Sequence, residues 1–168
     1  AVDKQVGALM DGVAKLDLPV NLFVTSDHGM DAVKAEKVIF LDDYIDLQQW
    51  RGKSKLILGG ALTYFYSPDA QLVKRTYAKL RGVTNVKVFK APAFPKWFHF
   101  SPSDPRTPDL VLVAEPGGYI GLRRAKDQNR VVKGAHGYRA DNNKNMHGIL
   151  MATGPSLKSG LVTPAVEN

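Results

Sequence analysis

The chain has 168 residues, of which 44% are hydrophobic, and it carries a formal net charge of +7. This length and composition favour a single domain with a real hydrophobic core and exclude a disordered or fibrous chain. No apolar run approaches the length of about 18 residues that a membrane helix needs, and the first residues lack the layout of a signal peptide, so we expect no transmembrane segment.

The charged residues and the absence of cysteine limit the kinds of binding site. Lysine and arginine are dispersed, with local pairs at Lys53 and Lys55 and at Arg123 and Arg124, and no basic stripe is interleaved with aromatic residues. Specific nucleic-acid binding is therefore not expected. Because the chain has no cysteine, any metal ion must be held by histidine and carboxylate side chains.

In chain order, the first segments predict alternating helix and strand. Apolar residues recur at three- and four-residue steps through residues 1–16, which predicts an amphipathic helix. Residues 20–25 predict a strand buried on both faces, of the kind found in parallel sheets. Residues 42–49 predict a short helix, and residues 61–66 predict another strand.

A second long helix is predicted over residues 69–81. Ser67 and Pro68 would serve as its N-cap and first helical residue, and Gly82 would end it. Further short strands are predicted at residues 86–89, 110–114 and 149–152.

Residues 91–108 carry five prolines, which is too many for regular structure. We expect a surface loop packed by its own aromatic side chains, which are Phe94, Trp97, Phe98 and Phe100. The whole pattern predicts an α/β domain with a largely parallel sheet, whose ligand sites lie at the carboxyl ends of strands.

The segment VTSDHGM, residues 24–30, places polar side chains at such a strand end. Asp27 and His28 supply the carboxylate oxygen and imidazole nitrogen that a zinc site without cysteine requires. Gly29 would free the backbone to turn, so that both side chains face one crevice. In the alternative interpretation, Asp27 caps the next segment, and His28 only forms a hydrogen bond with Asp27.

A second candidate ligand is His136, which lies in a loop between Gly134 and Gly137. Small flanking residues let a backbone approach a metal ion closely, so His136 is better placed than the other histidines. His147 leads into a strand and is expected to be a packed or surface residue, and His99 is expected to be structural.

Four motifs together resemble the nucleotide pyrophosphatase/phosphodiesterase family of the alkaline phosphatase superfamily. They are SDHGM at 26–30, PDLVLVAEPGGYI at 108–120, GAHGY at 134–138 and NMHGILMATGPSLKSG at 145–160. The resemblance spans nearly the whole chain and implies an alkaline-phosphatase-like fold. It also implies two zinc ions that hydrolyse phosphodiester or pyrophosphate bonds through a covalent threonine intermediate.

The resemblance also implies which residues bind the metal ions. Asp27 and His28 match ligands of the zinc that activates the nucleophile, and His136 matches a ligand of the other zinc. The family's threonine, its partner aspartate and the remaining zinc ligands match nothing in residues 1–168. We therefore expect residues 1–168 to be a single partial domain, the C-terminal portion of the catalytic domain, and to be inactive in isolation with weak metal binding.

The segment HGYRADNN departs from the family pattern HGYDN, because Arg139 and Ala140 stand between HGY and DN. The resemblance implies an exported enzyme with a nucleotide or other phosphodiester as its small-molecule substrate, and the choice among nucleotide, dinucleotide and lipid is open. Alternatives are a phosphomonoesterase, sulfatase or phosphoglycerate mutase of the same superfamily, or a non-catalytic metal-binding module. A sheet without its upstream strands would expose an edge, so self-association is also expected.

Overall fold

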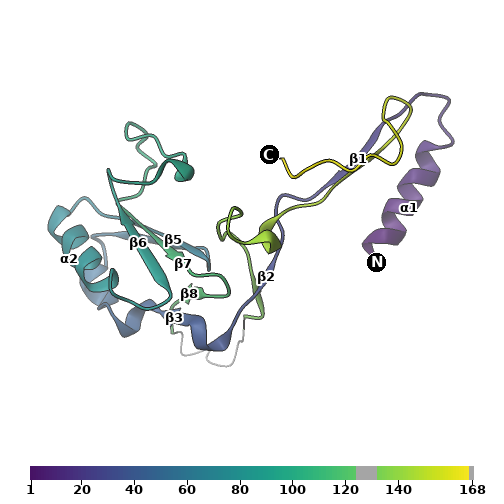
Figure 1. Ribbon diagram of the computed structural model, residues 1–168. Coiled ribbons are helices and arrows are strands. Elements are labelled where there is room, and N and C mark those ends of the chain that lie inside the picture. The colour runs from purple at the N-terminus through teal and green to yellow at the C-terminus, as the bar shows by residue number, and fades with distance from the viewer. Residues whose placement is uncertain (124–131, 167–168) are drawn as a thin grey trace. The chain divides into compact units, whose positions relative to one another are not determined.

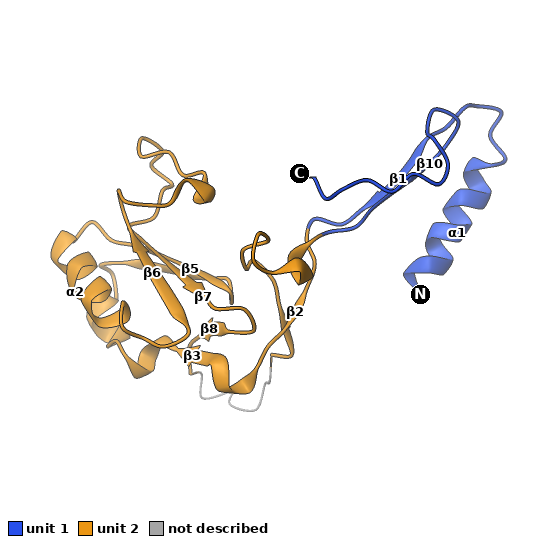
Figure 2. Ribbon diagram, in the orientation of Figure 1, with its two compact units in different colours: residues 1–27, 148–168 blue, residues 28–147 orange. Residues whose placement is uncertain are grey.

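The computed structural model describes residues 1–123 and 132–166 and divides the chain into two compact units (Figure 2). The first unit combines Ala1–Asp27 with Gly148–Asn168, and the second is His28–His147. The chain passes from one unit to the other at the peptide bond after Asp27 and again before Gly148. The expectation of a single partial catalytic domain stays a prediction.

The first unit contains one helix and a two-stranded ribbon. Helix α1 (Val2–Val13) confirms the predicted helix, and strand β1 (Leu22–Thr25) pairs antiparallel with β10 (Leu150–Thr153). The prediction that this first strand is buried on both faces is wrong, because its residues alternate between half-buried and exposed and Phe23 is 58% exposed. All four residues of the partner strand β10 are exposed.

The second unit is built on a four-stranded sheet with the order β4-β5-β7-β6, of which Figure 1 labels β5, β6 and β7. Its strands are β4 (Lys55–Leu58), β5 (Leu62–Tyr66), β6 (Val86–Lys90) and β7 (Leu110–Ala114). All three pairings in this sheet are antiparallel. The prediction of a largely parallel sheet is therefore wrong for the described residues.

Among the described residues, one pair of strands is parallel, and it joins β3 (Val38–Phe40) to β8 (Tyr119–Gly121). By contrast, β4 and β5 are joined by a tight turn, in which Gly60 has a positive φ of 76°. Such a turn can connect only antiparallel neighbours. The pattern of apolar residues identified β5, β6 and β7 but did not show how they pair.

Helix α2 (Ala70–Leu80) forms where the second long helix was predicted, but its cap is a different residue. The Asp69 carboxylate accepts hydrogen bonds from the backbone N–H groups of Gln71 and Leu72 at 2.9 and 3.0 Å, so Asp69 rather than Ser67 is the N-cap. Ser67 instead supports the cap, since its Oγ accepts a bond from the Asp69 N–H at 3.1 Å.

Short 3-10 helices occupy several connections. The predicted helix over residues 42–49 is replaced by two of them, Leu41–Asp43 and Leu47–Trp50. The Asp46 carboxylate starts the second one by accepting a hydrogen bond from the Gln48 N–H at 2.9 Å, which interrupts a continuous α-helix. The other 3-10 helices are Ala35–Lys37, Lys96–Phe98 and Lys144–Met146.

The proline-rich segment 91–108 is an irregular excursion packed by its own rings, as predicted. Phe98 stacks between Trp97 and Phe100, with ring centroids 3.8 and 5.2 Å away, and Phe94 meets Phe98 edge-on at 5.8 Å. This aromatic cluster packs the segment, whose helical structure is limited to the 3-10 helix Lys96–Phe98.

The main hydrophobic core lies within the second unit. Its largest fully buried apolar side chains come from the sheet, α2 and their flanking segments and are Phe65, Leu41, Leu80, Leu110, Leu112 and Ile120. Within the described residues, neither α1 nor α2 has the length and apolar character that a membrane span requires. The second unit also contains both histidines of the candidate site, His28 and His136.

Candidate functional site

The imidazole rings of His28 and His136 stack on each other. Their centroids are 3.7 Å apart, and their planes differ by 9°. The pairing of β2 (Asp31–Ala32) with β9 (Gly134–Ala135) accounts for this contact, because it places the residues after His28 beside those before His136. The structure thus brings together two histidines that the sequence had proposed for one site.

The tautomer of His28 follows from its neighbouring backbone. The Nδ1 atom lies 2.7 Å from the Gly29 carbonyl oxygen. Because a carbonyl oxygen can only accept, Nδ1 carries the proton, and in the neutral ring the lone pair is on Nε2. Metal-binding histidines commonly donate their second ring N–H in this way.

The stacking also restricts how the two rings could share metal ions. The lone pair of an imidazole nitrogen lies in the plane of its ring, so two parallel rings do not point at the same ion. Each ring can only bind an ion of its own. Two-metal phosphoryl-transfer sites have ions about 3.5–4 Å apart. The arrangement therefore fits one histidine per ion.

Asp27, the third predicted ligand, is exposed and ends the first unit, whereas both histidines belong to the second. Its role as a ligand stays a prediction from the sequence resemblance. Among residues 1–123 and 132–166, no three histidine or carboxylate side chains are grouped closely enough to hold a metal ion.

The remaining histidines lie at exposed positions. His99 has a left-handed backbone with φ of 54° and closes the 3-10 helix Lys96–Phe98, where its N–H donates to the Lys96 carbonyl at 2.9 Å. The Nε2 atom of His147 lies 3.2 Å from the Ala140 carbonyl oxygen. Both positions agree with the structural or surface roles expected for these residues.

Gly29 is required by a close approach of two backbones. Its N–H donates to the Met146 carbonyl at 2.9 Å, and a Cβ atom at this position would lie 1.9 Å from the Asn145 carbonyl oxygen. The sequence analysis assigned this glycine to a turn, but the structure shows that lack of space is the reason.

Asp31 was missed by the sequence analysis. Its carboxylate accepts hydrogen bonds from the Asn143 and Asn145 side-chain amides at 2.7 and 3.0 Å and from the Ala32 N–H at 2.8 Å. The bonds from Asn143 and Asn145 lower the pKa of the Asp31 carboxyl below its ordinary value. The cluster of asparagines in ADNNKN, which is typical of capped turns, was the available signal.

Tyr138 fixes the backbone just after His136. Its ring is buried, and its hydroxyl donates a short hydrogen bond to the Gly118 carbonyl at 2.5 Å. Burial raises the pKa of the Tyr138 hydroxyl to about 12. The next residue, Arg139, faces outward, where its guanidinium stacks on Trp97 at 4.5 Å and pairs with Asp141.

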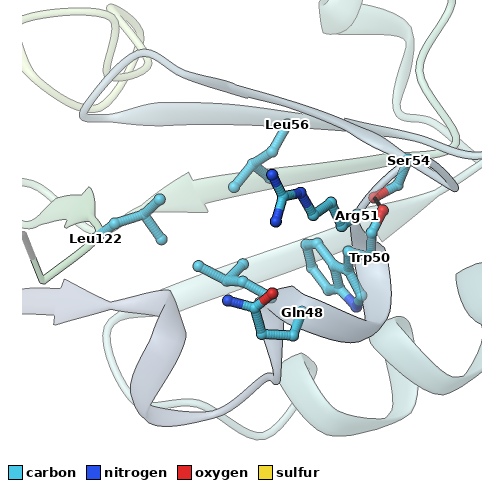
Figure 3. Close-up of a pocket in the computed structure, with 7 residues that line it drawn as sticks. Gln48, Trp50, Arg51, Ser54, Leu56 and Leu122 are labelled. Atoms are coloured by element: carbon cyan, nitrogen blue, oxygen red, sulfur yellow. Dashed lines mark hydrogen bonds between the residues drawn. The ribbon is translucent and has the colours of Figure 1, made fainter.

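A separate cavity of about 300 Å³ lies elsewhere in the second unit (Figure 3). Its lining residues are Leu47, Gln48, Trp50, Arg51, Ser54, Leu56 and Leu122. This lining includes no histidine or carboxylate, so the cavity is not a candidate metal site.

The sequence and fold match known proteins. Residues 1–139 match the family model of type I phosphodiesterase / nucleotide pyrophosphatase. The chain belongs to this family. Human ectonucleotide pyrophosphatase/phosphodiesterase family member 5 is 28% identical over 170 residues, covering 99% of this chain but 34% of that protein. Human family member 1 is 30% identical over 179 residues, covering 99% of this chain and 18% of that protein.

Solved structures of the phosphodiesterase family agree with this assignment. Mouse member 5 superposes with a TM-score of 0.75 and 32% identity, covering 92% of this chain and 39% of that one. An inactive threonine-to-alanine variant of the mouse protein, solved in complex with AMP, gives a TM-score of 0.74. The alkaline-phosphatase-like α/β class is therefore confirmed, and the chain spans about a third of the human member 5 length.

Proposed function

We propose that this chain is part of a zinc-dependent phosphodiesterase or nucleotide pyrophosphatase that uses a covalent threonine intermediate. The nucleophile would come from a segment that is not among these 168 residues. The observation that carries the proposal is the stacked pair of His28 and His136 in a chain of this family. The family match favours this reaction over that of a phosphomonoesterase, sulfatase or phosphoglycerate mutase.

His28 would bind one zinc ion through Nε2, with Asp27 as a further ligand by sequence resemblance, and His136 would bind the other. Zinc would lower the pKa of the threonine hydroxyl that acts as the nucleophile and would stabilise the departing oxygen. The Gly29 carbonyl would hold His28 in the tautomer that a ligand needs, since it accepts the Nδ1 proton. The nearly parallel orientation of the two rings supports the assignment of one histidine to each ion.

The substrate would be a nucleotide or another small phosphodiester. The support comes from relatives, since the human proteins are named ectonucleotide pyrophosphatase/phosphodiesterases and the mouse relative was solved with AMP. The same names support action outside the cell. Because a phosphodiester is anionic, the net charge of +7 is compatible with such a substrate.

Calorimetric titration of the chain with Zn²⁺ tests the metal assignment. We expect weak binding that falls at least about tenfold in His28→Ala and in His136→Ala, because each variant removes a ligand. His99→Ala is the matched control and should bind as the unchanged chain does. Unaltered affinity in both His28→Ala and His136→Ala would refute the assignment. The chain alone should not hydrolyse a nitrophenyl phosphodiester.

A further inference from the structure

The segment that follows His136 is held at both of its ends by the segment that follows His28. At one end, β2 pairs with β9, so that Asp31 lies opposite Ala135, the residue before His136. At the other end, the Asp31 carboxylate reaches the turn that contains Asn143 and Asn145. One residue therefore contacts both ends of the segment, through its backbone position at one end and its side chain at the other.

Asn143 transmits this contact to the backbone. Its side chain is buried, with 8% exposed, and it donates from Nδ2 to Asp31 while its Oδ1 accepts from the Asn145 N–H at 3.1 Å. It thereby caps the 3-10 helix Lys144–Met146. The carboxylate of Asp31 thus fixes the place where this short helix begins.

The short helix in turn contacts the backbone beside His28. The Met146 carbonyl, at the end of the helix, accepts the Gly29 N–H, and the Gly29 carbonyl accepts the Nδ1 proton of His28. Four hydrogen bonds, joined by short stretches of backbone at residues 145–146 and at Gly29, therefore lead from the Asp31 carboxylate to the His28 ring.

We infer that Asp31 is a positioning residue that sets the stacking of His28 and His136. It touches neither ring in the interactions described above and acts through Asn143, Asn145 and the 3-10 helix that they begin. The inference rests on the proposed function only in taking these two histidines as the working pair. The geometry itself does not require a metal ion.

The test is a measurement of the histidine ring signals by nuclear magnetic resonance on the metal-free chain. The chain has four histidines, so the signals are few and can be assigned with His28→Gln and His136→Gln. In Asp31→Asn, a second amide would face the donor groups of Asn143 and Asn145. We expect the His28 and His136 signals to shift, because the ring current that each feels depends on the stacking distance, while the His99 signals stay in place.

A double variant provides the rescue. Asp31→Asn combined with Asn143→Asp exchanges the two partners, so the amide at 31 donates to a carboxylate at 143 that can still cap the 3-10 helix. The two histidine signals should return toward their original positions. Asp46→Asn is the matched control, because Asp46 also caps a 3-10 helix, accepting from the Gln48 N–H and the Gln49 side chain, and it should leave both signals unchanged.

The inference is overturned if Asp31→Asn leaves both signals in place, or if the double variant restores neither. If Asp31→Asn does not fold, Asn145→Ala replaces it, since this variant removes one donor and keeps the bond from Asn143. A smaller shift of the same two signals is then expected, and its absence overturns the inference. Failure of zinc to bind would refute the proposed function and leave this result standing, because the measurement contains no metal.

Discussion

The two units of the chain bury their apolar residues to very different degrees. Every buried hydrophobic residue of the described ranges belongs to the second unit, His28–His147. In the first unit, many apolar side chains are more than half exposed, and they include Val2, Leu9, Phe23, Leu150 and Met151. The difference shows that apolar composition alone does not produce burial, because a helix and a ribbon need further layers to form a core.

The largest expected effect contrasts a phenylalanine from each unit. Phe65 in β5 is 0% exposed, so Phe65→Ala should lower the free energy of unfolding by about 3–5 kcal/mol. Phe23 in β1 is 58% exposed, so Phe23→Ala should change it by less than about 0.5 kcal/mol. Urea unfolding of the full chain, followed by circular dichroism, measures both. Equal losses would show that the first unit has a core of comparable strength.

The next effect tests the close backbone contact beside His28. Gly29→Ala should destabilise the second unit by roughly 1–3 kcal/mol, because the new methyl group would meet the Asn145 and His147 carbonyl oxygens. Gly82→Ala is the control, since no atom lies within 4 Å of the position of its Cβ. The control should be neutral or gain up to about 1 kcal/mol from a less flexible unfolded chain. A stable Gly29→Ala protein in the same urea assay would contradict the contact.

The smallest expected effect is the pH dependence of the stabilisation by Asp31, which lies in the second unit. The pKa of Asp31 is lowered in the folded chain by its bonds from Asn143 and Asn145, so the unfolded chain binds more protons in acid. The stabilisation is therefore complete at neutral pH and is lost as the pH falls through the lowered pKa. The stability difference between the unchanged chain and Asp31→Asn should shrink from neutral pH to about pH 2. A difference that stays constant over this range would show that the ionised carboxylate is not the cause.

Periodicity in the sequence was enough to find the long helices and several strands. It predicted α1, α2 and the strands β5, β6 and β7, and proline content predicted the irregular segment 91–108. The strand order was not predictable in the same way, because a buried apolar run looks alike in parallel and antiparallel sheets. The three-residue strands β3 and β8 were missed because such short runs carry no clear period.

For the candidate site, the sequence indicated which residues could bind a metal ion. It did not indicate which other residues hold them in place. It selected His28 and His136, and the structure stacks their rings, while their roles as ligands, like that of Asp27, stay predictions. It missed Asp31, because the function of that carboxylate depends on Asn143 and Asn145, which are distant in the sequence. No local pattern links residues that only folding brings together.

The fixed ends of the segment after His136 have a consequence for how this region can evolve. Tyr138 and Asn143 are both buried, whereas residues 140–142 between them are exposed. Lengthening such a segment by one residue costs well under about 0.6 kcal/mol in loop-closure entropy. A change of length in residues 139–142 would therefore carry a small entropic cost. An insertion there would lengthen an exposed segment while the hydrogen bonds of Tyr138 and Asn143 keep its two ends in place.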